Sequence, residues 1–254
     1  MRHRNLLILA VVCIVSVAGA LLWSRPLRPA IASGHPAWPP IMFQDNQAID
    51  GAGAALLTKI FTDLNLRVNV TYTGAWDEVQ TKAKNGDVDL IVAAYKTAER
   101  EAYMDYSISY TTDPVAVFVK KGVTFPFTTW DDLKQKRGLA TVGDSYGQAF
   151  DDYEKANLEL TRVAAPSDAF DALTEGTADY FIYSIYAGED IMKQKQTTGQ
   201  FVALQTYVAE EPFYITVAKK SPYAKYLPQI NAELEKYKAD GTIDRLIAGY
   251  RTNE

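Results

Sequence analysis

Six side chains able to bind a polar solute stand at the end of, or just after, short apolar runs of the sequence. They are Tyr95, Arg100, Asp144, Ser145, Tyr183 and Ser184. The guanidinium of Arg100 could hold a carboxylate with two parallel hydrogen bonds. Asp144 and Ser145 stand in a glycine-flanked turn, 143–147, that opens a predicted helix, where free backbone N–H groups favour an anion or a carbonyl oxygen. These residues predict a binding site for a small polar molecule.

The sequence has few of the residues that other kinds of functional site require. The chain has one cysteine, Cys13, and two histidines, His3 and His35, all near its N-terminus. A disulfide framework, a cysteine nucleophile, a zinc site and a histidine-based triad are therefore not expected in the rest of the chain. We expect no cofactor and no metal.

The apolar runs predict buried strands that alternate with helices, which is typical of an α/β protein. Strands are predicted at 67–72, 90–93, 116–119, 139–142, 180–183 and 214–218, and helices at 51–64, 129–133, 227–237 and 243–250. In an open, mostly parallel sheet, ligands bind beyond the carboxyl ends of the strands. The six side chains are therefore expected around a common cleft.

One segment of the sequence is repeated. The pattern of residues 84–91, Lys-Asn-Gly-Asp-Val-Asp-Leu-Ile, recurs at 174–181 as Thr-Glu-Gly-Thr-Ala-Asp-Tyr-Phe. In each copy a glycine ends a helix, because glycine adopts the left-handed cap conformation freely. An aspartate, Asp89 or Asp179, then leads into a strand. The repeat predicts two lobes of similar construction, with both aspartates capping turns away from the cleft.

The N-terminus has the features of an export signal. Residues 2–4 are Arg-His-Arg, and an uncharged apolar run from Leu6 to Trp23 follows, as in a secretory leader. Small residues precede a cleavage site after Ala32, so residues 1–32 are predicted to be a cleaved signal peptide. The apolar run is also long enough to span a membrane, so an uncleaved anchor is the alternative. Either way, the remainder is expected to be exported.

The composition agrees with a folded, exported protein. Of 254 residues, 48% are hydrophobic and 22% are charged, and the formal net charge is -5. The sequence has no clustered basic stripe, so nucleic acid is not an expected partner. Aromatic residues make up 12% of the chain, which leaves some of them free to line a binding surface.

Five short motifs, in order, resemble those of the bacterial extracellular solute-binding proteins of the polar-amino-acid type (family 3), the receptors of ABC importers. They are Pro39-Pro40-Ile41-Met42-Phe43 with Gly51, Gly86 to Asp89, Thr97-Ala98-Glu99-Arg100 with Ser107 and Tyr110, Val115 to Lys120 with Trp130-Asp131-Asp132-Leu133, and Asp240-Gly241-Thr242-Ile243. The resemblance implies a two-lobed, periplasmic-binding-protein-like α/β fold with mostly parallel sheets and a ligand cleft between the lobes. Lobe 1 is expected at residues 36–118 plus 209–254, and lobe 2 at residues 119–208.

The resemblance also implies roles for individual residues. In the family, the arginine of Thr-x-x-Arg binds the ligand's α-carboxylate, and here that residue is Arg100. Trp38 and Trp76 stand where aromatic residues stack on the ligand. Asp144 and Ser145 stand in the turn that supplies hydroxyl and backbone donors.

Two departures from the family pattern concern the ligand. An aspartate that holds the ligand's ammonium normally follows five residues after the second Gly-x-x-Asp aspartate, and here that position is Ser184. The stretch before Thr-x-x-Arg is Val92-Ala93-Ala94-Tyr95, where the family is rich in hydroxyl groups. A standard α-amino acid would lose its ammonium partner unless Asp144 substitutes, because an unpaired buried ammonium is costly.

The candidate residues also have purely structural explanations. Arg100 could form a solvated ion pair with a neighbouring glutamate. Trp38, Trp76 and Tyr183 could be core aromatics, which is the commoner fate of tryptophan. Ser145 could cap its helix.

We therefore predict a monomeric receptor that closes by hinge motion on a small polar solute bearing a carboxylate, and that delivers it to an ABC permease of the inner membrane. Its predicted location is the periplasm. One alternative is a periplasmic enzyme on the same scaffold, similar to cyclohexadienyl dehydratases, with Asp144 or Glu189 as general acid. The other is a membrane-anchored ligand-sensing domain, favoured if the apolar N-terminal run stays uncleaved.

Overall fold

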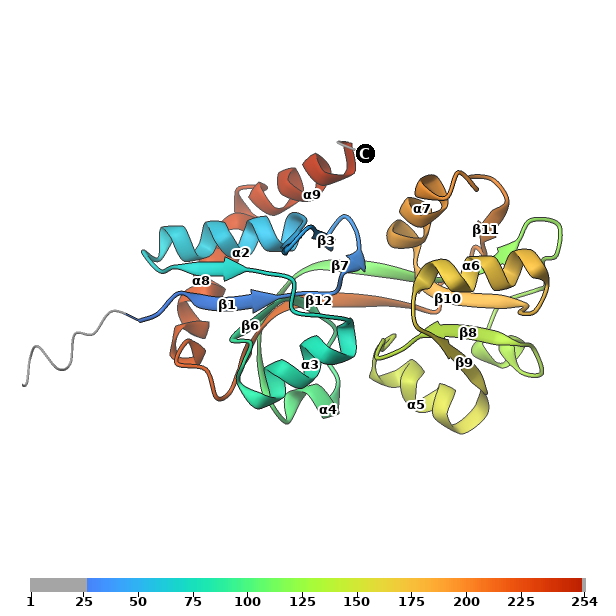
Figure 1. Cartoon of the computed structure of the whole chain (residues 1–254), viewed down its shortest axis with the longest axis horizontal. Helices are drawn as coiled ribbons and strands as arrows, with labels where there is room; N and C mark the ends of the chain where they lie inside the picture. The colour runs from blue at the N-terminus through green and yellow to red at the C-terminus, as the bar shows by residue number, and fades with distance from the viewer. Residues whose placement is uncertain (1–26, 253–254) are drawn as a thin grey trace, which may run out of the picture.

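The structure is a computed structural model that describes residues 27–252. Two lobes lie side by side and are joined by two long strands (Figure 1). These strands, β7 (Met104–Lys120) and β12 (Ala209–Ala218), pair antiparallel and run from one lobe into the other. The two lobes therefore share one continuous sheet at their junction.

Lobe 1 is built on a parallel sheet. Its strands are β1 (Ala30–Ser33), β5 (Val68–Val70) and β6 (Leu90–Ala94), in the order β5-β1-β6, and β12 pairs antiparallel with β6. A small antiparallel sheet follows β1, made of β2 (Ala37–Trp38), β3 (Met42–Asp45) and β4 (Ala48–Asp50). The helices are α2 (Ala52–Asp63), α3 (Trp76–Asn85), α4 (Ala98–Glu101), α8 (Leu227–Ala239) and α9 (Thr242–Thr252), with a 3₁₀ turn, η2 (Ala224–Tyr226).

Lobe 2 repeats this plan with different strands. Its sheet has the order β7-β10-β8-β9, in which β10 (Tyr180–Ser184), β8 (Gly138–Thr141) and β9 (Leu160–Val163) are parallel. A short strand, β11 (Phe201–Ala203), pairs with β7. The helices are α5 (Gln148–Asn157), α6 (Pro166–Glu175) and α7 (Ile185–Gln194), with a 3₁₀ turn, η1 (Trp130–Leu133). The predicted strands all occur, although β5 is shorter than the predicted 67–72. The predicted helices also occur, except that residues 130–133 form a 3₁₀ turn.

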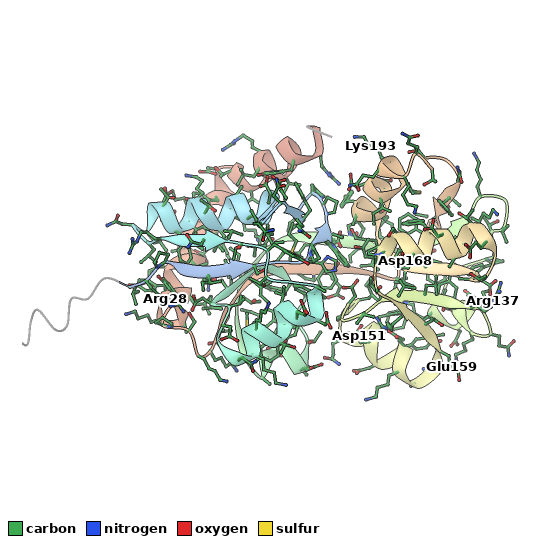
Figure 2. All side chains as sticks on the ribbon, in the orientation of Figure 1. Arg28, Arg137, Asp151, Glu159, Asp168 and Lys193 are labelled. Atoms are coloured by element: carbon green, nitrogen blue, oxygen red, sulfur yellow. The ribbon has the colours of Figure 1, made fainter. Side chains whose placement is uncertain are left out.

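The repeated aspartates hold the outer ends of the two lobes. Asp89 accepts a hydrogen bond from the backbone N–H of Ile31 at 2.8 Å and pairs with Arg28 at 2.6 Å. Asp179 accepts from the backbone N–H of Arg137 at 2.7 Å and pairs with its guanidinium at 2.6 Å. Arg28 and Arg137 lie at opposite ends of the molecule (Figure 2). Both aspartates therefore serve strand entries, as the sequence predicts.

The structure contradicts the predicted cleavage after Ala32. Ala30 and Ala32 are fully buried, and β1 is flanked by β5 on one side and β6 on the other. A cut after Ala32 would remove most of this inner strand together with Arg28. A cleavage that leaves the sheet intact must come before Ala30, the first residue of β1, and this strand starts lobe 1 before residue 36. The apolar run from Leu6 to Trp23 lies outside the described residues, and the other lobe boundaries stay predictions.

None of the helices within residues 27–252 is both long enough and apolar enough to cross a membrane.

We predict that a chain beginning at Leu27 melts like the exported protein, whereas a chain beginning at Ser33 loses cooperative unfolding. Without Arg28, the side chain of Asp89, which is 0% exposed, keeps a buried charge with no ionic partner. The shorter chain also lacks residues 30–32 of β1, so β5 and β6 lose most of the strand that lies between them, and a typical domain has only about 5–15 kcal/mol of stability to lose. Thermal melts followed by circular dichroism test this, and equal melting temperatures for the two chains would contradict it.

Candidate functional site

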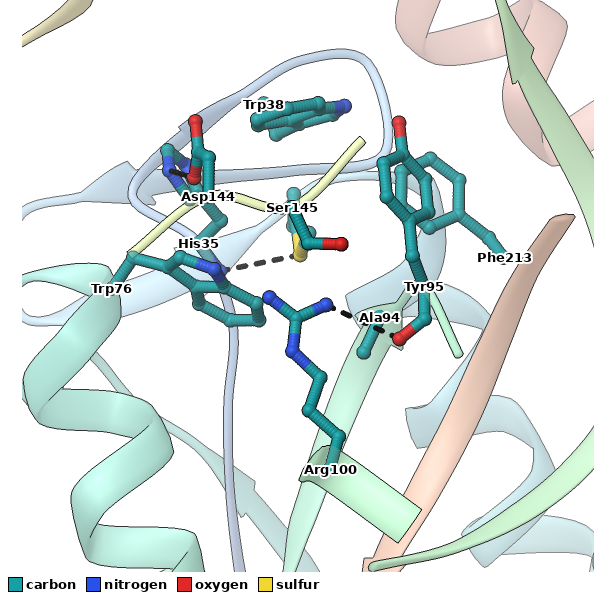
Figure 3. A pocket seen from close by; sticks show the side chains of 10 residues that line it. His35, Trp38, Trp76, Ala94, Tyr95, Arg100, Asp144, Ser145 and Phe213 are labelled. Atoms are coloured by element: carbon teal, nitrogen blue, oxygen red, sulfur yellow. Dashed lines mark hydrogen bonds and ion pairs between the residues drawn. The ribbon is translucent and has the colours of Figure 1, made fainter. Parts of the chain in front are cut away.

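A pocket with an empty volume of about 230 Å³ lies between the lobes, beyond the carboxyl ends of the parallel strands (Figure 3). The residues that line it are His35, Trp38, Met42, Trp76, Ala94, Tyr95, Arg100, Asp144, Ser145 and Phe213. Arg100, Asp144 and Ser145 also line a larger outer cleft between α3, α4 and α5. Six of the eight predicted site residues, all except Tyr183 and Ser184, thus line one pocket.

Arg100 is held by the one-turn helix α4. The hydroxyl of Thr97 caps this helix by accepting a hydrogen bond from the backbone N–H of Arg100 at 3.2 Å. The guanidinium donates to the carbonyl oxygen of Tyr95 at 3.1 Å and to that of Gly143, in lobe 2, at 3.4 Å. It lies 5.3 Å from the ring centroid of Trp76. Arg100 is 6% exposed, so a cation is buried here against an aromatic ring.

The neighbouring glutamates do not neutralise Arg100. Glu101 pairs instead with Lys96 at 2.7 Å, and none of the ion pairs among the described residues involves Arg100. The solvated ion pair that the sequence left open is therefore not formed.

Trp38 and Tyr95 are fixed by an acid that the sequence analysis missed. The indole Nε1 of Trp38 donates to Oδ2 of Asp113 at 2.8 Å, and the hydroxyl of Tyr95 donates to the same oxygen. Ser184 donates to Oδ1 of Asp113 at 2.8 Å. Asp113, on β7, is 2% exposed. Burial raises the pKa of Asp113 to about 6, although its three hydrogen bonds act in the opposite direction.

Ser184 and Tyr183 support the pocket from behind and do not line it. Ser184 is fully buried, and besides bonding Asp113 it caps α7 by accepting from the backbone N–H of Ala187 at 3.5 Å. The hydroxyl of Tyr183 donates to the carbonyl oxygen of Ala37, and its ring centroid lies 4.7 Å from that of Trp38. The predicted ligand contacts of these two residues are not supported by this geometry.

The turn after β8 brings lobe 2 to the pocket. Ser145 lines the pocket, but its hydroxyl also donates to Asp151 and accepts from the backbone N–H of Gly147 at 3.2 Å. Gly147 has a φ of 92°, and a Cβ there would collide with the carboxylate of Glu211 on β12. Glycine suits this position because L-residues avoid such φ values, and a Cβ would also displace the end of the Glu211 side chain. Ser145 does not cap α5, because the N-cap residue of this helix is Gly147 and no side chain caps it.

His35 is the pocket residue whose signal the sequence analysis overlooked. It follows the carboxyl end of β1, so the strand-end rule locates it once residues 30–33 are recognised as a strand. It is 4% exposed, and its ring centroid lies 5.0 Å from that of Trp38 and 5.4 Å from that of Trp76. Its Nε2 lies 3.3 Å from Oδ1 of Asp144.

The pocket therefore has the guanidinium of Arg100, the imidazole of His35, the carboxylate of Asp144 and aromatic walls. Within residues 27–252, no three or more His, Cys, Asp and Glu side chains are grouped so that they could hold a metal ion. The arrangement suits non-covalent binding of a small molecule with polar ends and an apolar middle.

Two lobes of α/β construction, joined by a pair of antiparallel strands and enclosing a pocket, define a periplasmic-binding-protein-like fold. The chain belongs to the bacterial extracellular solute-binding proteins, family 3, whose family model matches residues 31–253. The fold class and the family predicted from the sequence are thus confirmed.

Individual relatives agree with this membership. The chain is 33% identical over 171 residues to the ABC transporter glutamine-binding protein GlnH of Bacillus subtilis (strain 168), an alignment that covers 64% of this chain and 58% of that relative. An ancestral arginine-binding protein bound to glutamine superposes with a TM-score of 0.72 at 25% identity, covering 88% of this chain and 98% of the other. A histidine kinase sensor domain with similarity to periplasmic binding proteins shares the fold, with a TM-score of 0.74 at 21% identity, covering 88% of this chain and 96% of the other.

We predict that Asp113→Asn removes a pH dependence of stability. The pKa of Asp113 is about 6 in the folded protein, above its ordinary value of 3.8, so the folded state binds this proton more tightly than the unfolded state. Stability from this group is therefore greatest below about pH 4 and is lost as the pH rises through about 6. The melting temperature of the parent should fall, relative to that of Asp113→Asn, between about pH 4 and pH 7.

Thermal melts of the two proteins over this pH range test the prediction. Asp168→Asn, which removes an exposed carboxylate at the start of α6, serves as control and should keep the parent's pH dependence. A constant difference between the parent and Asp113→Asn at all pH values would contradict it.

Proposed function

We propose that this protein is the solute receptor of an ABC importer, and that it captures a small carboxylate-bearing molecule in the periplasm without changing it chemically. The observation that carries the proposal is the buried guanidinium of Arg100, which borders the pocket and has no acidic partner among residues 27–252. An acidic group of a bound solute would supply the partner that residues 27–252 do not provide for this cation.

The hydrogen-bonding capacity of Arg100 supports a carboxylate as that partner. A guanidinium has five N–H donors, and the hydrogen bonds found within the described residues go to two backbone carbonyl oxygens. A carboxylate can take two parallel hydrogen bonds from the remaining donors and neutralise the charge. The aromatic side chains of Trp38, Trp76 and Phe213 wall this pocket, so the solute is expected to be small.

The contacts across the cleft support a closing mechanism. Besides the bond from Arg100 to Gly143, the backbone N–H of Ala98 in lobe 1 donates to Oε1 of Gln148 in lobe 2 at 2.9 Å. A solute that touches both lobes favours this closed state over an open one, because it makes more contacts there. We place the hinge in β7 and β12, which connect the lobes, and propose that the permease recognises the closed form.

The relatives guide the choice of solute. One is named as a glutamine-binding protein and another as an arginine-binding protein bound to glutamine. Amino acids are therefore the first probes to use, together with simple dicarboxylates that share only the acidic group.

We predict that Arg100→Ala lowers the affinity for the tightest-binding acid of such a panel by at least about a hundredfold. Losing the guanidinium leaves a desolvated carboxylate unpaired, which costs roughly 3–5 kcal/mol. Isothermal titration calorimetry measures the effect. Arg137→Ala, which removes an exposed arginine at the far end of lobe 2 (Figure 2), is the matched control and should bind like the parent.

Two results would contradict the proposal. One is equal affinity of Arg100→Ala and the parent for every acid that binds. The other is multiple turnover of a bound acid, detected by proton NMR after prolonged incubation, which would support the enzyme alternative.

A further inference from the structure

Asp144 borders the pocket as an acid without hydrogen-bond donors. Its side chain is 1% exposed, and its Oδ1 lies 3.3 Å from Nε2 of His35. This separation is within ion-pair range, but the geometry is not that of a hydrogen bond, and neither oxygen of the carboxylate has a hydrogen-bond partner among the described residues. Because a carboxylate buried without donors is costly, a donor from outside the chain would stabilise it.

His35 does not supply the missing positive charge. Its Nδ1 accepts a hydrogen bond from the backbone N–H of Ala37 at 2.9 Å, so this network assigns the proton of a neutral ring to Nε2. A neutral imidazole turned towards Asp144 leaves the carboxylate charge uncompensated. The pocket thus has a positive charge at Arg100 on lobe 1 and a negative charge at Asp144 on lobe 2, as Figure 3 shows.

Ser184, at the position where the family has an ammonium-binding aspartate, is not accessible to a solute in this chain. The hydroxyl of Ser184 is used by Asp113, and neither residue lines the pocket. Asp113 in turn already accepts hydrogen bonds from Trp38 and Tyr95. Of the residues that line the pocket, Asp144 is the acidic one, so a cationic group of a bound solute meets Asp144.

We propose that Asp144 binds a cationic N–H group of the solute, so that the preferred ligands are zwitterions whose carboxylate binds Arg100. This inference rests on the proposed receptor function and adds the class of solute. His35 positions the carboxylate, and Trp38 and Trp76 enclose the part of the solute between its charges.

This assignment makes closure depend on both charges of the ligand. A zwitterion bridges Arg100 in lobe 1 and Asp144 in lobe 2, whereas a solute with a carboxylate alone satisfies lobe 1 only. An uncharged group placed against Asp144 would leave that buried acid unpaired. Solutes without a cationic group are therefore expected to bind more weakly, because the pocket would close over an unpaired charge.

The experiment compares matched ligands with the full exported protein. The panel contains the common L-amino acids, succinate and glutarate, and each amino acid whose side chain carries no cation is paired with the analogue that lacks the α-ammonium, as L-glutamine is paired with glutaramate. In calorimetry, the tightest-binding amino acid should bind at least about 100-fold more tightly than its ammonium-free analogue, and small-angle X-ray scattering should show compaction with the amino acid only.

Two variants test whether Asp144 binds the cationic group. Asp144→Asn should weaken binding of the amino acid by about 100-fold and leave the affinity for its ammonium-free analogue unchanged. Asp168→Asn makes the same change of charge at an exposed position of α6, and should leave both affinities unchanged. In the ligand-free protein, Asp144→Asn should not lower the melting temperature, because it removes a carboxylate that lacks donors.

Several outcomes would overturn the inference. If Asp144→Asn binds amino acids as tightly as the parent while Arg100→Ala does not bind them, Asp144 is not the cation site, although the receptor function stands. Tightest binding of succinate or glutarate, or no binding by any amino acid of the panel, would refute the zwitterion assignment. A clear fall in the melting temperature of ligand-free Asp144→Asn would show that the acid serves the fold through His35.

Discussion

The closed arrangement depends on one buried carboxylate, that of Asp113. It stands on β7, a strand that both lobes share, and it receives hydrogen bonds from Trp38 and Tyr95 of lobe 1 and from Ser184 of lobe 2. A buried acid is tolerated only when such donors are in place, so these side chains are constrained to fixed positions. A residue that does not line the pocket thereby sets two of its walls and links both lobes to the connecting strand.

The parts of the fold that are encoded locally could be predicted from the sequence. β6 and β10 are buried at every position, so hydrophobicity alone marks them as strands. The rule that ligands bind beyond the carboxyl ends of parallel strands then predicts that Arg100 and Asp144 share one cleft. The order of the motifs predicts the family, and the family predicts Trp38 as a site residue. Trp38 lies in a short strand that no apolar run in the sequence indicates.

The parts that depend on distant segments could not be predicted in this way. The small residues of β1 suit an inner strand, but small residues are also what a signal peptidase reads, so the local pattern has two explanations. Because β1 was not predicted as a strand, His35 at its carboxyl end was not predicted as a pocket residue. Asp113 acquires its role from partners 75, 18 and 71 positions away, and no spacing along the chain indicates such a convergence. The same network explains why Ser184 faces an acid and does not face the pocket.

The place of β12 in the sheet has a consequence for the order of folding. β12 pairs with both β6 and β7, although it follows β6 by more than a hundred residues and β7 by nearly ninety. Lobe 2 draws its strands β8, β9 and β10 from one continuous stretch, so a chain that emerges N-terminus first can assemble them early. Lobe 1 keeps an open edge at β6 until residues 209–218 arrive, and contacts between such distant segments form slowly. Lobe 1 therefore cannot be completed until β12, which also connects the two lobes, has joined its sheet. At that point nearly all of the chain is available.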